Sequence, residues 1–337
     1  MMEIGISDIA YSLGSSIKTN VELEREYPHW NFEHLESRTG VKQRPISPDG
    51  ETALDISLRA CETLIDSGRL KAEEIDALIF CTETPDHVIP PNSCILHGKL
   101  GLKTSTIAFD ITLACSGYPY TLLLAKSLIS SGSARNVLVV NADTYSRLIS
   151  PDDRSTRVLF GDGGAVSIIT SENPRYLVTD VQLGTAGSYF KRFYVEAGGL
   201  RTPNAPTDDQ IKDKHGNIKD PEYISMDGLG ILTFFNSVLP PEINKFLAKN
   251  NMSIQDVDLM IPHQSSAVSL EGLRRALKIE QDRFVIDIET TGNLVSASIP
   301  TAFSRALEQK RIKSGDKVLL CGFGVGLSWG LTLIDVK

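Results

Sequence analysis

Cys115 is the residue of this sequence best placed for nucleophilic chemistry. It follows a predicted strand at 106–110 and lies just before a predicted buried helix at 116–131. A cysteine at a helix N-terminus faces the positive end of the helix dipole, which lowers the pKa of the thiol and favours the nucleophilic thiolate. An ordinary buried core cysteine is the commoner environment for this residue type, so the interpretation depends on partner groups.

Two candidate partners, His263 and Asn293, lie in the second half of the chain. His263 directly follows the apolar run 259–262, at the carboxyl end of a predicted strand, where open α/β sheets bind their ligands. Asn293 lies just before a predicted helix at 296–303. Taken singly, each also suits a structural role, as a hydrogen-bonded histidine and a helix-capping asparagine. Together with Cys115 they form a candidate nucleophilic site.

The glycine-rich segment 322–330, GFGVGLSWG, is a further candidate element of this site. It lacks the Lys-Ser/Thr ending of a phosphate-binding loop and continues into an apolar strand at 331–334, which disfavours nucleotide binding. Glycines allow the backbone to approach a reacting centre closely and leave N–H groups free to form an oxyanion hole. The similar segment 160–167 is expected to make a tight turn and to pack a strand against its neighbours.

Short β-branched runs, such as 77–81 and 137–140, alternate with longer helical patterns along the chain, which indicates an α/β fold. Three landmarks recur in the same order about 180 residues apart: 74–80 with 255–261, 110–115 with 287–293, and 131–140 with 314–320. This period is far too long for a solenoid or propeller unit. We therefore predict two duplicated halves, residues 1–175 carrying Cys115 and residues 176–337 carrying His263 and Asn293. Chance similarity between strand–helix units is the alternative.

The composition excludes several classes of protein. The 337 residues include 34 basic and 42 acidic ones, for a net charge of −8, which argues against binding of nucleic acid or of an anionic membrane surface. No apolar run reaches the 18 residues of a membrane span, and the N-terminal sequence does not resemble a secretory signal, so a cytoplasmic location is expected. Five cysteines without a C-x-x-C pair argue against a disulfide framework or a zinc ribbon. The polar stretch 197–227 is predicted to be a long surface excursion.

Taken in order, these segments resemble the β-ketoacyl-acyl-carrier-protein synthase III family of thiolase-like condensing enzymes. The resemblance rests on Cys115, His263, Asn293 and the glycine-rich segment, together with LESRTGVKQR at 35–44 and FGDGG at 160–164, and it covers about residues 3–335. It implies a five-layered αβαβα fold from two duplicated halves and a homodimer. It also implies an enzyme that needs no metal or other cofactor.

The same resemblance implies a role for each residue of the site. Cys115 would carry an acyl primer as a thioester, and His263 and Asn293 would stabilise the enolate formed when a malonyl thioester loses carbon dioxide. Backbone N–H groups of Cys115 and Val325 would form the oxyanion hole. The implied partners are acyl-CoA or acyl-ACP, with acyl carrier protein delivering the malonyl group, in fatty-acid or specialised acyl and polyketide biosynthesis.

Several positions depart from the family pattern. His34 stands where the family commonly has a tryptophan that stacks on the adenine of coenzyme A, and Trp30 is a candidate substitute one helical turn away. Val268 stands where the family often has a docking arginine, and Val325 replaces a glycine. Ile89 replaces the phenylalanine gate that acetyl-using members contribute across the dimer. These changes suggest a specialised primer or acyl acceptor.

The contacts to substrate and carrier are predicted from the same pattern. Ile89 and Phe323 are assigned to the substrate pocket or gate, and four basic residues to coenzyme A or carrier-protein binding: Arg38, Arg154, Arg274 and Arg275. The last two lie with Lys278 on one helical stretch and could form a local patch for an acidic carrier protein. A merely solvated helix face is the alternative.

Three other functions remain open. Glu83 lies 32 positions before Cys115, much as the general acid/base glutamate does in hydroxymethylglutaryl-CoA synthase, although a carboxylate there could equally cap a turn or lie at the dimer contact. The acyl group could instead pass from Cys115 to an alcohol or amine without condensation. A non-catalytic scaffold is the third, and the intact Cys-His-Asn set argues against it.

Overall fold

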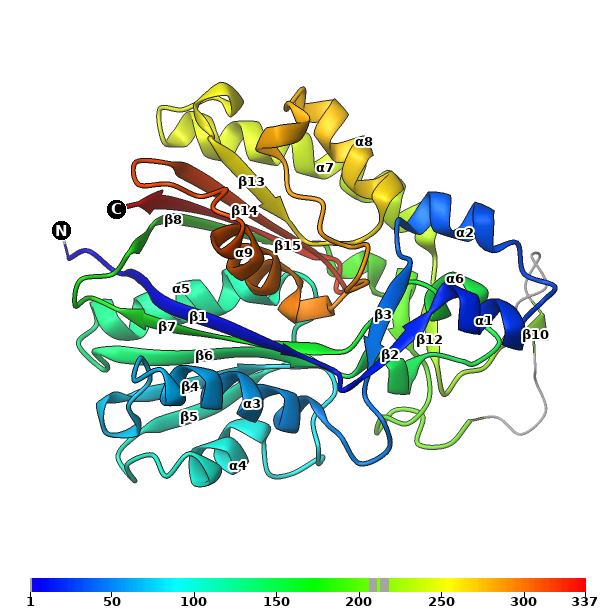
Figure 1. The fold of residues 1–337 in the computed structure, drawn as a ribbon, viewed down its shortest axis with the longest axis horizontal. Helices are drawn as coiled ribbons and strands as arrows, with labels where there is room; N and C mark the ends of the chain where they lie inside the picture. Colours follow the sequence, from blue (N-terminus) through cyan, green and yellow to red (C-terminus); the bar gives the residue numbers. More distant parts are fainter. Residues whose placement is uncertain (1, 206–210, 213–217) are drawn as a thin grey trace.

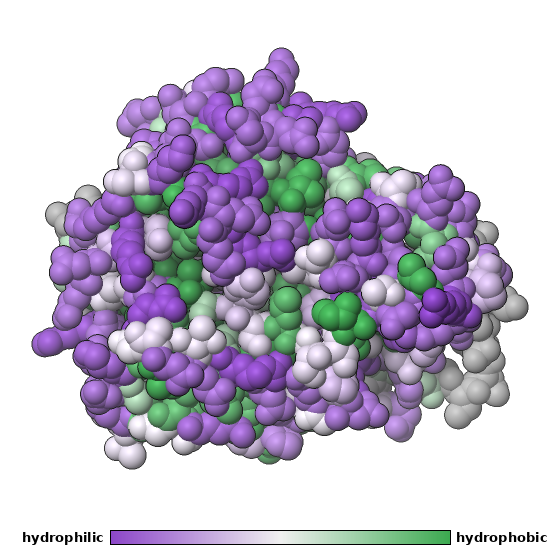
Figure 2. Space-filling view, viewed as in Figure 1, coloured by the Kyte–Doolittle hydropathy of each residue, from purple (hydrophilic) through white to green (hydrophobic). Residues whose placement is uncertain are grey.

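The computed structural model describes residues 2–205, 211–212 and 218–337. The most polar part of the predicted surface excursion therefore lies largely outside the described residues. Within them, no helix is long and apolar enough to cross a membrane. The face of the molecule in Figure 2 is mostly hydrophilic, with small separate apolar areas.

Nine strands of the described chain form one mixed sheet in the order β13-β14-β15-β8-β1-β7-β6-β4-β5. Their bounds are β1 Gly5–Leu13, β4 Ala77–Cys81, β5 Ile107–Ile111, β6 Asn136–Asp143, β7 Gly163–Thr170, β8 Tyr176–Thr185, β13 Leu259–Pro262, β14 Lys317–Gly324 and β15 Ser328–Val336. The sheet is continuous because β1 pairs with β8 over a short antiparallel register at Gly5 and Ile6.

The strand order of the first half recurs in the second. β1-β7-β6 pair antiparallel and β6-β4-β5 pair parallel, while β8-β15-β14 pair antiparallel and β14-β13 pair parallel. Phe284 takes the place of the fifth strand through a parallel bridge to Met260. The predicted α/β fold of two duplicated halves is thus confirmed. The boundary between the halves, at residues 175 and 176, stays a prediction.

Helices cover both sides of these strands and fill the space between them (Figure 1). One outer layer holds α3 (Ala53–Asp66) and α4 (Asn92–Lys99), the other holds α7 (Gly228–Lys249) and α8 (Ala267–Leu277), and α5 (Gly117–Ser130) and α9 (Ser298–Glu308) lie in the middle. The layer order is therefore αβαβα. α3 forms locally because Thr52 and Asp55 make a capping box and its buried residues fall on one helical face.

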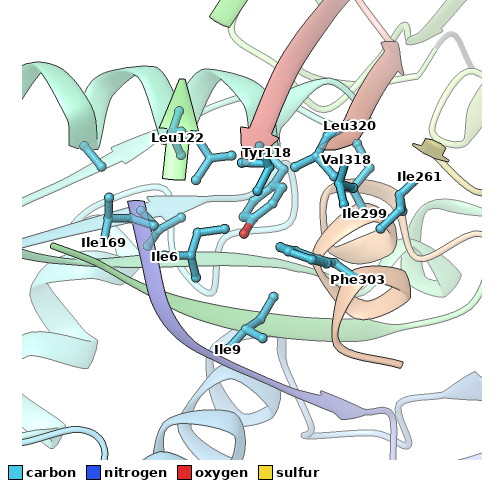
Figure 3. Close-up of a cluster of buried hydrophobic side chains, with 14 of the residues drawn as sticks. Ile6, Ile9, Tyr118, Leu122, Ile169, Ile261, Ile299, Phe303, Val318 and Leu320 are labelled. Carbon is cyan, nitrogen blue, oxygen red and sulfur yellow. The ribbon is translucent and has the colours of Figure 1, made fainter. Parts of the chain in front are cut away.

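The middle layer is the largest core of the described residues. Tyr118 of α5 and Phe303 of α9 pack between strand residues of both halves, including Ile6 and Val318 (Figure 3). The buried hydroxyl of Tyr118 has a hydrogen-bond partner, the Ser167 hydroxyl at 2.9 Å. The prediction of a buried helix after Cys115 is confirmed, with only its solvent-side serines exposed. This core fixes the first turns of α5 and α9, which follow Cys115 and Asn293.

The remaining elements form a cap at the end of the molecule away from the two termini (Figure 1). They are β2 Ser16–Thr19, α1 Asn20–Glu26, α2 Phe32–Thr39, β3 Gln43–Ile46, α6 Arg154–Arg157, β9 Phe193–Val195, β10 Ile211–Lys212, β11 Ile218–Lys219 and β12 Ile224–Met226. Short 3-10 helices complete the described elements: Ala72–Glu74, Tyr145–Leu148, Gly187–Arg192, Ile254–Asp256, Gln281–Arg283 and Val295–Ala297. The cap lies over the sheet end where the polar candidates are found.

Candidate active site

A cavity of about 310 Å³ under the cap brings Cys115, His263 and Asn293 together. The three residues are 2–6% exposed. Most of the remaining wall is apolar, formed among others by Leu159, Phe160, Phe193, Phe235, Phe323 and Val325. The cavity therefore combines a few polar groups with a mostly apolar wall, as small-molecule sites commonly do.

Cys115 lies in the turn between β5 and α5, against the glycine-rich segment. A Cβ built on Gly324 would be 2.5 Å from the Cβ of Cys115 and 3.0 Å from its Sγ. A Cβ on Gly322 would be 3.1 Å from the Cys115 carbonyl oxygen. Only glycine allows this approach at 324, because a methyl group there would overlap Cys115, whereas a methyl group at 322 would make a tight contact.

The thiol of Cys115 is protonated in this environment. Burial raises its pKa well above the usual value, and the nearby carboxylates of Glu83 and Asp143 raise it further. The predicted lowering of this pKa by the helix N-terminus is wrong, because desolvation of the thiolate outweighs the dipole here. Any reaction at this sulfur as a nucleophile would therefore require a base that takes the thiol proton.

His263 is held at the end of β13 as a neutral imidazole. Its backbone N–H donates to the Cys321 carbonyl at 2.8 Å, and its ring packs edge-on against Phe323 with centroids 5.5 Å apart. Burial lowers its pKa to about 3. Its Nδ1 has no hydrogen-bond partner among the described residues. A neutral imidazole carries one N–H and one free lone pair, so it can both accept and donate a proton.

Asn293 is held in place by hydrogen bonds of its backbone and of its side-chain oxygen. Its N–H donates to the Leu159 carbonyl at 2.9 Å, and its carbonyl accepts from Gly161 at 3.0 Å. The Oδ1 atom accepts from the Val295 N–H at 2.9 Å, which closes a local turn; the alternative role of a helix cap is wrong, because the N-caps of the two following helices are Leu294 and Ala297. Nδ2 makes no hydrogen bond to the part of the chain that the structure describes, so it remains available to a ligand in the cavity.

A pair of serines, which no sequence pattern indicates, joins the glycine-rich segment to the turn that contains Cys115. The hydroxyls of Ser116 and Ser328 share a 2.7 Å hydrogen bond, and the Ser328 hydroxyl donates to the Val325 carbonyl at 2.7 Å. Because Ser328 donates to Val325, Ser116 must be the donor to Ser328. The loop that contains the Val325 N–H is thus fixed relative to Cys115.

Comparisons with known proteins agree on one family. Residues 109–187 match the family described as 3-Oxoacyl-[acyl-carrier-protein (ACP)] synthase III, and residues 247–336 match its C-terminal family. A β-ketoacyl-[acyl-carrier-protein] synthase III of Clostridium perfringens is 35% identical over 95% of this chain and 96% of its own. A β-ketoacyl-[acyl-carrier-protein] synthase III of Caldanaerobacter subterraneus is 33% identical over 98% of this chain and 97% of its own. The chain belongs to the 3-oxoacyl-[acyl-carrier-protein] synthase III family.

Solved structures of this synthase family share the fold. A crystal structure of a 3-oxoacyl-(acyl-carrier-protein) synthase III has a TM-score of 0.95 and 34% identity, covering 99% of both chains. A 3-oxoacyl-(acyl-carrier protein) synthase from Burkholderia xenovorans has a TM-score of 0.90 and 29% identity, covering 99% of this chain and 94% of that one. The thiolase-like fold and the general activity of a condensing acyltransferase are thereby confirmed.

The other residues predicted for this synthase's site lie in different places. Phe323, Val325 and Arg38 line the cavity. Ile89 does not; it is 83% exposed on the loop after β4. Arg154 is exposed on α6, next to the cavity residue Ser155.

The predicted arginine patch on α8 and the predicted adenine-stacking residue Trp30 both make contacts within the chain. Arg274 and Arg275 both pair with Glu271 on α8, each at 2.7 Å, and neither lines the cavity. Trp30 is buried and stacks on Tyr27 with ring centroids 4.2 Å apart. Trp30 therefore has no free face for an adenine ring, and the suggested substitution is wrong.

Glu83 belongs to a buried acidic network beside Cys115, not to an exposed turn. Tyr145 donates its hydroxyl to the Glu83 carboxylate, and the Glu83 N–H donates to Asp143 at 2.8 Å. Asp143 also accepts from the Ser296 hydroxyl at 2.5 Å. Burial raises the pKa of Glu83, and raises that of Asp143 to about 7. Sequence patterns identified Glu83 but not Asp143, Tyr145 or Ser296.

Proposed function

We propose that this chain loads an acyl primer onto Cys115 as a thioester and then condenses it with the malonyl group of malonyl-ACP. One observation carries this proposal. Cys115, His263 and Asn293, from two halves of the fold, line a single apolar cavity against a glycine-rich backbone segment. The reaction type is inferred from the family's general condensing activity, and the residues that carry it out are inferred from the lining of the cavity.

In the loading step, Cys115 Sγ attacks the carbonyl carbon of the primer thioester. The thiol proton passes to the neutral His263 and then to the departing coenzyme A or carrier thiol as the old C–S bond breaks. The backbone N–H groups of Cys115 and Val325 would stabilise the tetrahedral oxyanion, each donor contributing roughly 3 kcal/mol. The link from Ser116 to Ser328 and Val325 supports this arrangement, because it keeps the two N–H groups on one rigid unit.

In the condensation step, the C–C bond to the malonyl carboxylate breaks and its electron pair forms the thioester enolate as carbon dioxide leaves. The N–H of neutral His263 and the Nδ2 of Asn293 would donate hydrogen bonds to the enolate oxygen. The enolate carbon then attacks the acyl-Cys115 carbonyl and expels the thiolate, which regains a proton. The low pKa of His263 supports this role, because an uncharged donor stabilises the enolate without protonating its carbon first.

The proposal includes a homodimer formed along β5. This strand ends the nine-stranded sheet with an unpaired edge, and Val88, Ile89 and Ile107 beside it are exposed. Symmetric pairing would cover these side chains and carry Ile89 toward the partner's cavity. Sedimentation should show a dimer that Ile107→Lys converts to monomer, and a monomeric wild type would contradict this assignment.

Arg38 and Arg154 remain the proposed contacts for coenzyme A or carrier protein, since both lie at or beside the cavity. Arg274 and Arg275 are weaker candidates for the carrier patch because Glu271 neutralises part of their charge. Absence of a metal or other cofactor remains part of the proposal. So does a cytoplasmic location, which fits five cysteines that are all unpaired.

Glu83 supports a second candidate, a condensation of the hydroxymethylglutaryl-CoA synthase type. Its carboxyl is half-buried, and its charge acts on the thiol of Cys115. Such a group could remove a proton from the donor thioester in place of decarboxylation. Acyl transfer to an alcohol or amine is the remaining alternative for an acylated Cys115.

Product analysis separates these functions. With a primer thioester and malonyl-ACP, decarboxylative condensation should give a β-ketoacyl-ACP two carbons longer than the primer and one carbon dioxide per product. A Glu83→Gln variant should still form this product. Carbon–carbon bond formation without carbon dioxide release, lost in Glu83→Gln, would favour the second candidate; transfer products alone would reject condensation.

A further inference from the structure

We propose that a second cavity, in the cap, binds a small oxyanion of the phosphate type. This cavity has a volume of about 210 Å³ and lies between the β2–β3 pair and the segment around α6. Its polar lining comes from Ser16, Lys18, Arg44, Ser146 and Arg157. It is distinct from the catalytic cavity, with which it shares only Phe160 among the lining residues.

Arg44 is a buried cation whose contacts are all to uncharged groups. Its side chain is 0% exposed, and it donates to the Lys18 carbonyl at 2.9 Å, the Asn20 Oδ1 at 2.5 Å and the Val158 carbonyl at 2.7 Å. Its Nε has no partner among the described residues. A buried guanidinium without a direct ion-pair partner is costly, so an anion at the unpartnered donor would stabilise it.

Arg157 adds a second positive charge to the same cavity. Its side chain makes no hydrogen bond or ion pair to the residues that the structure describes. Burial, and secondarily the charge of Arg157, lower the pKa of Arg44 to about 10. Both guanidiniums line this one cavity, so their charges repel each other, and an anion between them would remove that repulsion.

The acidic groups around the cavity are engaged elsewhere. Glu26 pairs with Lys18, and Glu36 accepts from the Asn20 amide at 2.9 Å. Asp162 accepts the Ser146 hydroxyl at 2.6 Å and the Ser47 N–H at 2.7 Å. None of them makes a hydrogen bond or ion pair to Arg44 or Arg157 in the described chain. Glu36 acts on the Arg44 charge only from a distance, through the Asn20 amide that lies between them, and Arg157 has no acidic partner among the described residues.

Two guanidiniums select for oxyanions, because their N–H groups match the spacing of oxygens on a phosphate. The ligand chemistry is shared by inorganic phosphate and by the phosphate group of a nucleotide. The small volume favours the free ion.

Thermal unfolding of the full chain with added inorganic phosphate tests this site. At constant ionic strength set with chloride, phosphate should raise the midpoint in a saturable way, as expected for a ligand of the folded state. Arg157→Met should weaken the apparent phosphate affinity by roughly tenfold to a hundredfold. Arg25→Met, which removes an exposed charge from the nearby α1, should leave it unchanged.

Adenosine 3′,5′-bisphosphate in the same assay distinguishes the source of the phosphate group. Stabilisation by the nucleotide that depends on Arg157 would assign the cavity to a nucleotide phosphate, and stabilisation by the inorganic ion alone would assign it to free phosphate. No specific effect of either ligand on the wild type, or equal effects on Arg157→Met and wild type, would overturn the proposal. If Arg157→Met does not fold, crystals soaked in selenate decide: an anomalous peak at Arg44 Nε supports the site, and its absence refutes it.

Discussion

At the scale of single residues, the proposed chemistry depends on two groups that burial keeps uncharged. The Cys115 thiol is protonated because its thiolate would be desolvated beside two carboxylates, and His263 is neutral because its imidazolium would be desolvated. A neutral thiol and a neutral base in one cavity exchange no proton until a thioester arrives. This arrangement confines proton transfer to the moment of attack.

Gly324 sets the space available to the nucleophile. In Gly324→Ala, the new methyl group would lie 2.5 Å from the Cys115 Cβ, so the cysteine must shift. We expect acylation to slow by about 100-fold, because small displacements of a reacting atom cost that much. Gly98→Ala is the matched control, since its methyl group would meet no atom within 4 Å. A wild-type acylation rate in folded Gly324→Ala would refute the role of this contact.

Because His263 is buried as a neutral imidazole, the free energy of unfolding should decrease when the pH is lowered. Its pKa is about 3 in the folded chain and near the ordinary value of 6.5 when unfolded, so the unfolded chain binds more protons between these values. The free energy of unfolding from this residue therefore falls as pH drops through that window, by at most about 1.4 kcal/mol per pH unit. Urea unfolding across this range should show a shallower dependence in His263→Gln, whereas exposed His34→Gln should match wild type. Parallel curves for His263→Gln and wild type would show that His263 is not held neutral by the fold.

At the scale of elements, the site is assembled by turns that follow strands. His263 follows β13, and Cys115 and Asn293 precede α5 and α9, so their placement could be predicted from strand and helix patterns. The pairs that Arg274 and Arg275 make with Glu271 could also be predicted, because they follow the helical spacing of three and four residues. The Ser116–Ser328 contact could not be predicted, because it joins residues 212 positions apart with no periodic pattern.

That serine contact should position the oxyanion-hole segment and not bind substrate. Ser328→Ala removes the hydroxyl that joins Ser116 to the Val325 carbonyl. We expect kcat to fall by roughly tenfold with little change in KM, because the hole acts on the transition state. Ser127→Ala, on the exposed side of α5, serves as the control. A rise in KM at constant kcat would assign Ser328 to ground-state binding instead.

At the scale of the whole molecule, duplication explains why residues from distant parts of the sequence share one cavity. The two runs of strands place α5 and α9 in one middle layer, and the turns before these helices open toward the same end. Repeated landmarks predicted this architecture. The burial of Cys115 and Trp30 could not be predicted, because it depends on the packing of all layers. Burial raises the pKa of Cys115 where the helix dipole was expected to lower it, and it leaves Trp30 inaccessible to a ligand.

The central claim is that Cys115 is the acyl carrier, and intact-protein mass spectrometry tests it most directly. After incubation with acyl thioesters of graded length, the wild type should gain the mass of one acyl group, mapped to the peptide that contains Cys115. Cys115→Ala should gain none, and Cys61→Ala should behave as wild type, because Cys61 is fully buried in α3 and does not line the cavity. Stoichiometric acylation that persists in Cys115→Ala would contradict the account.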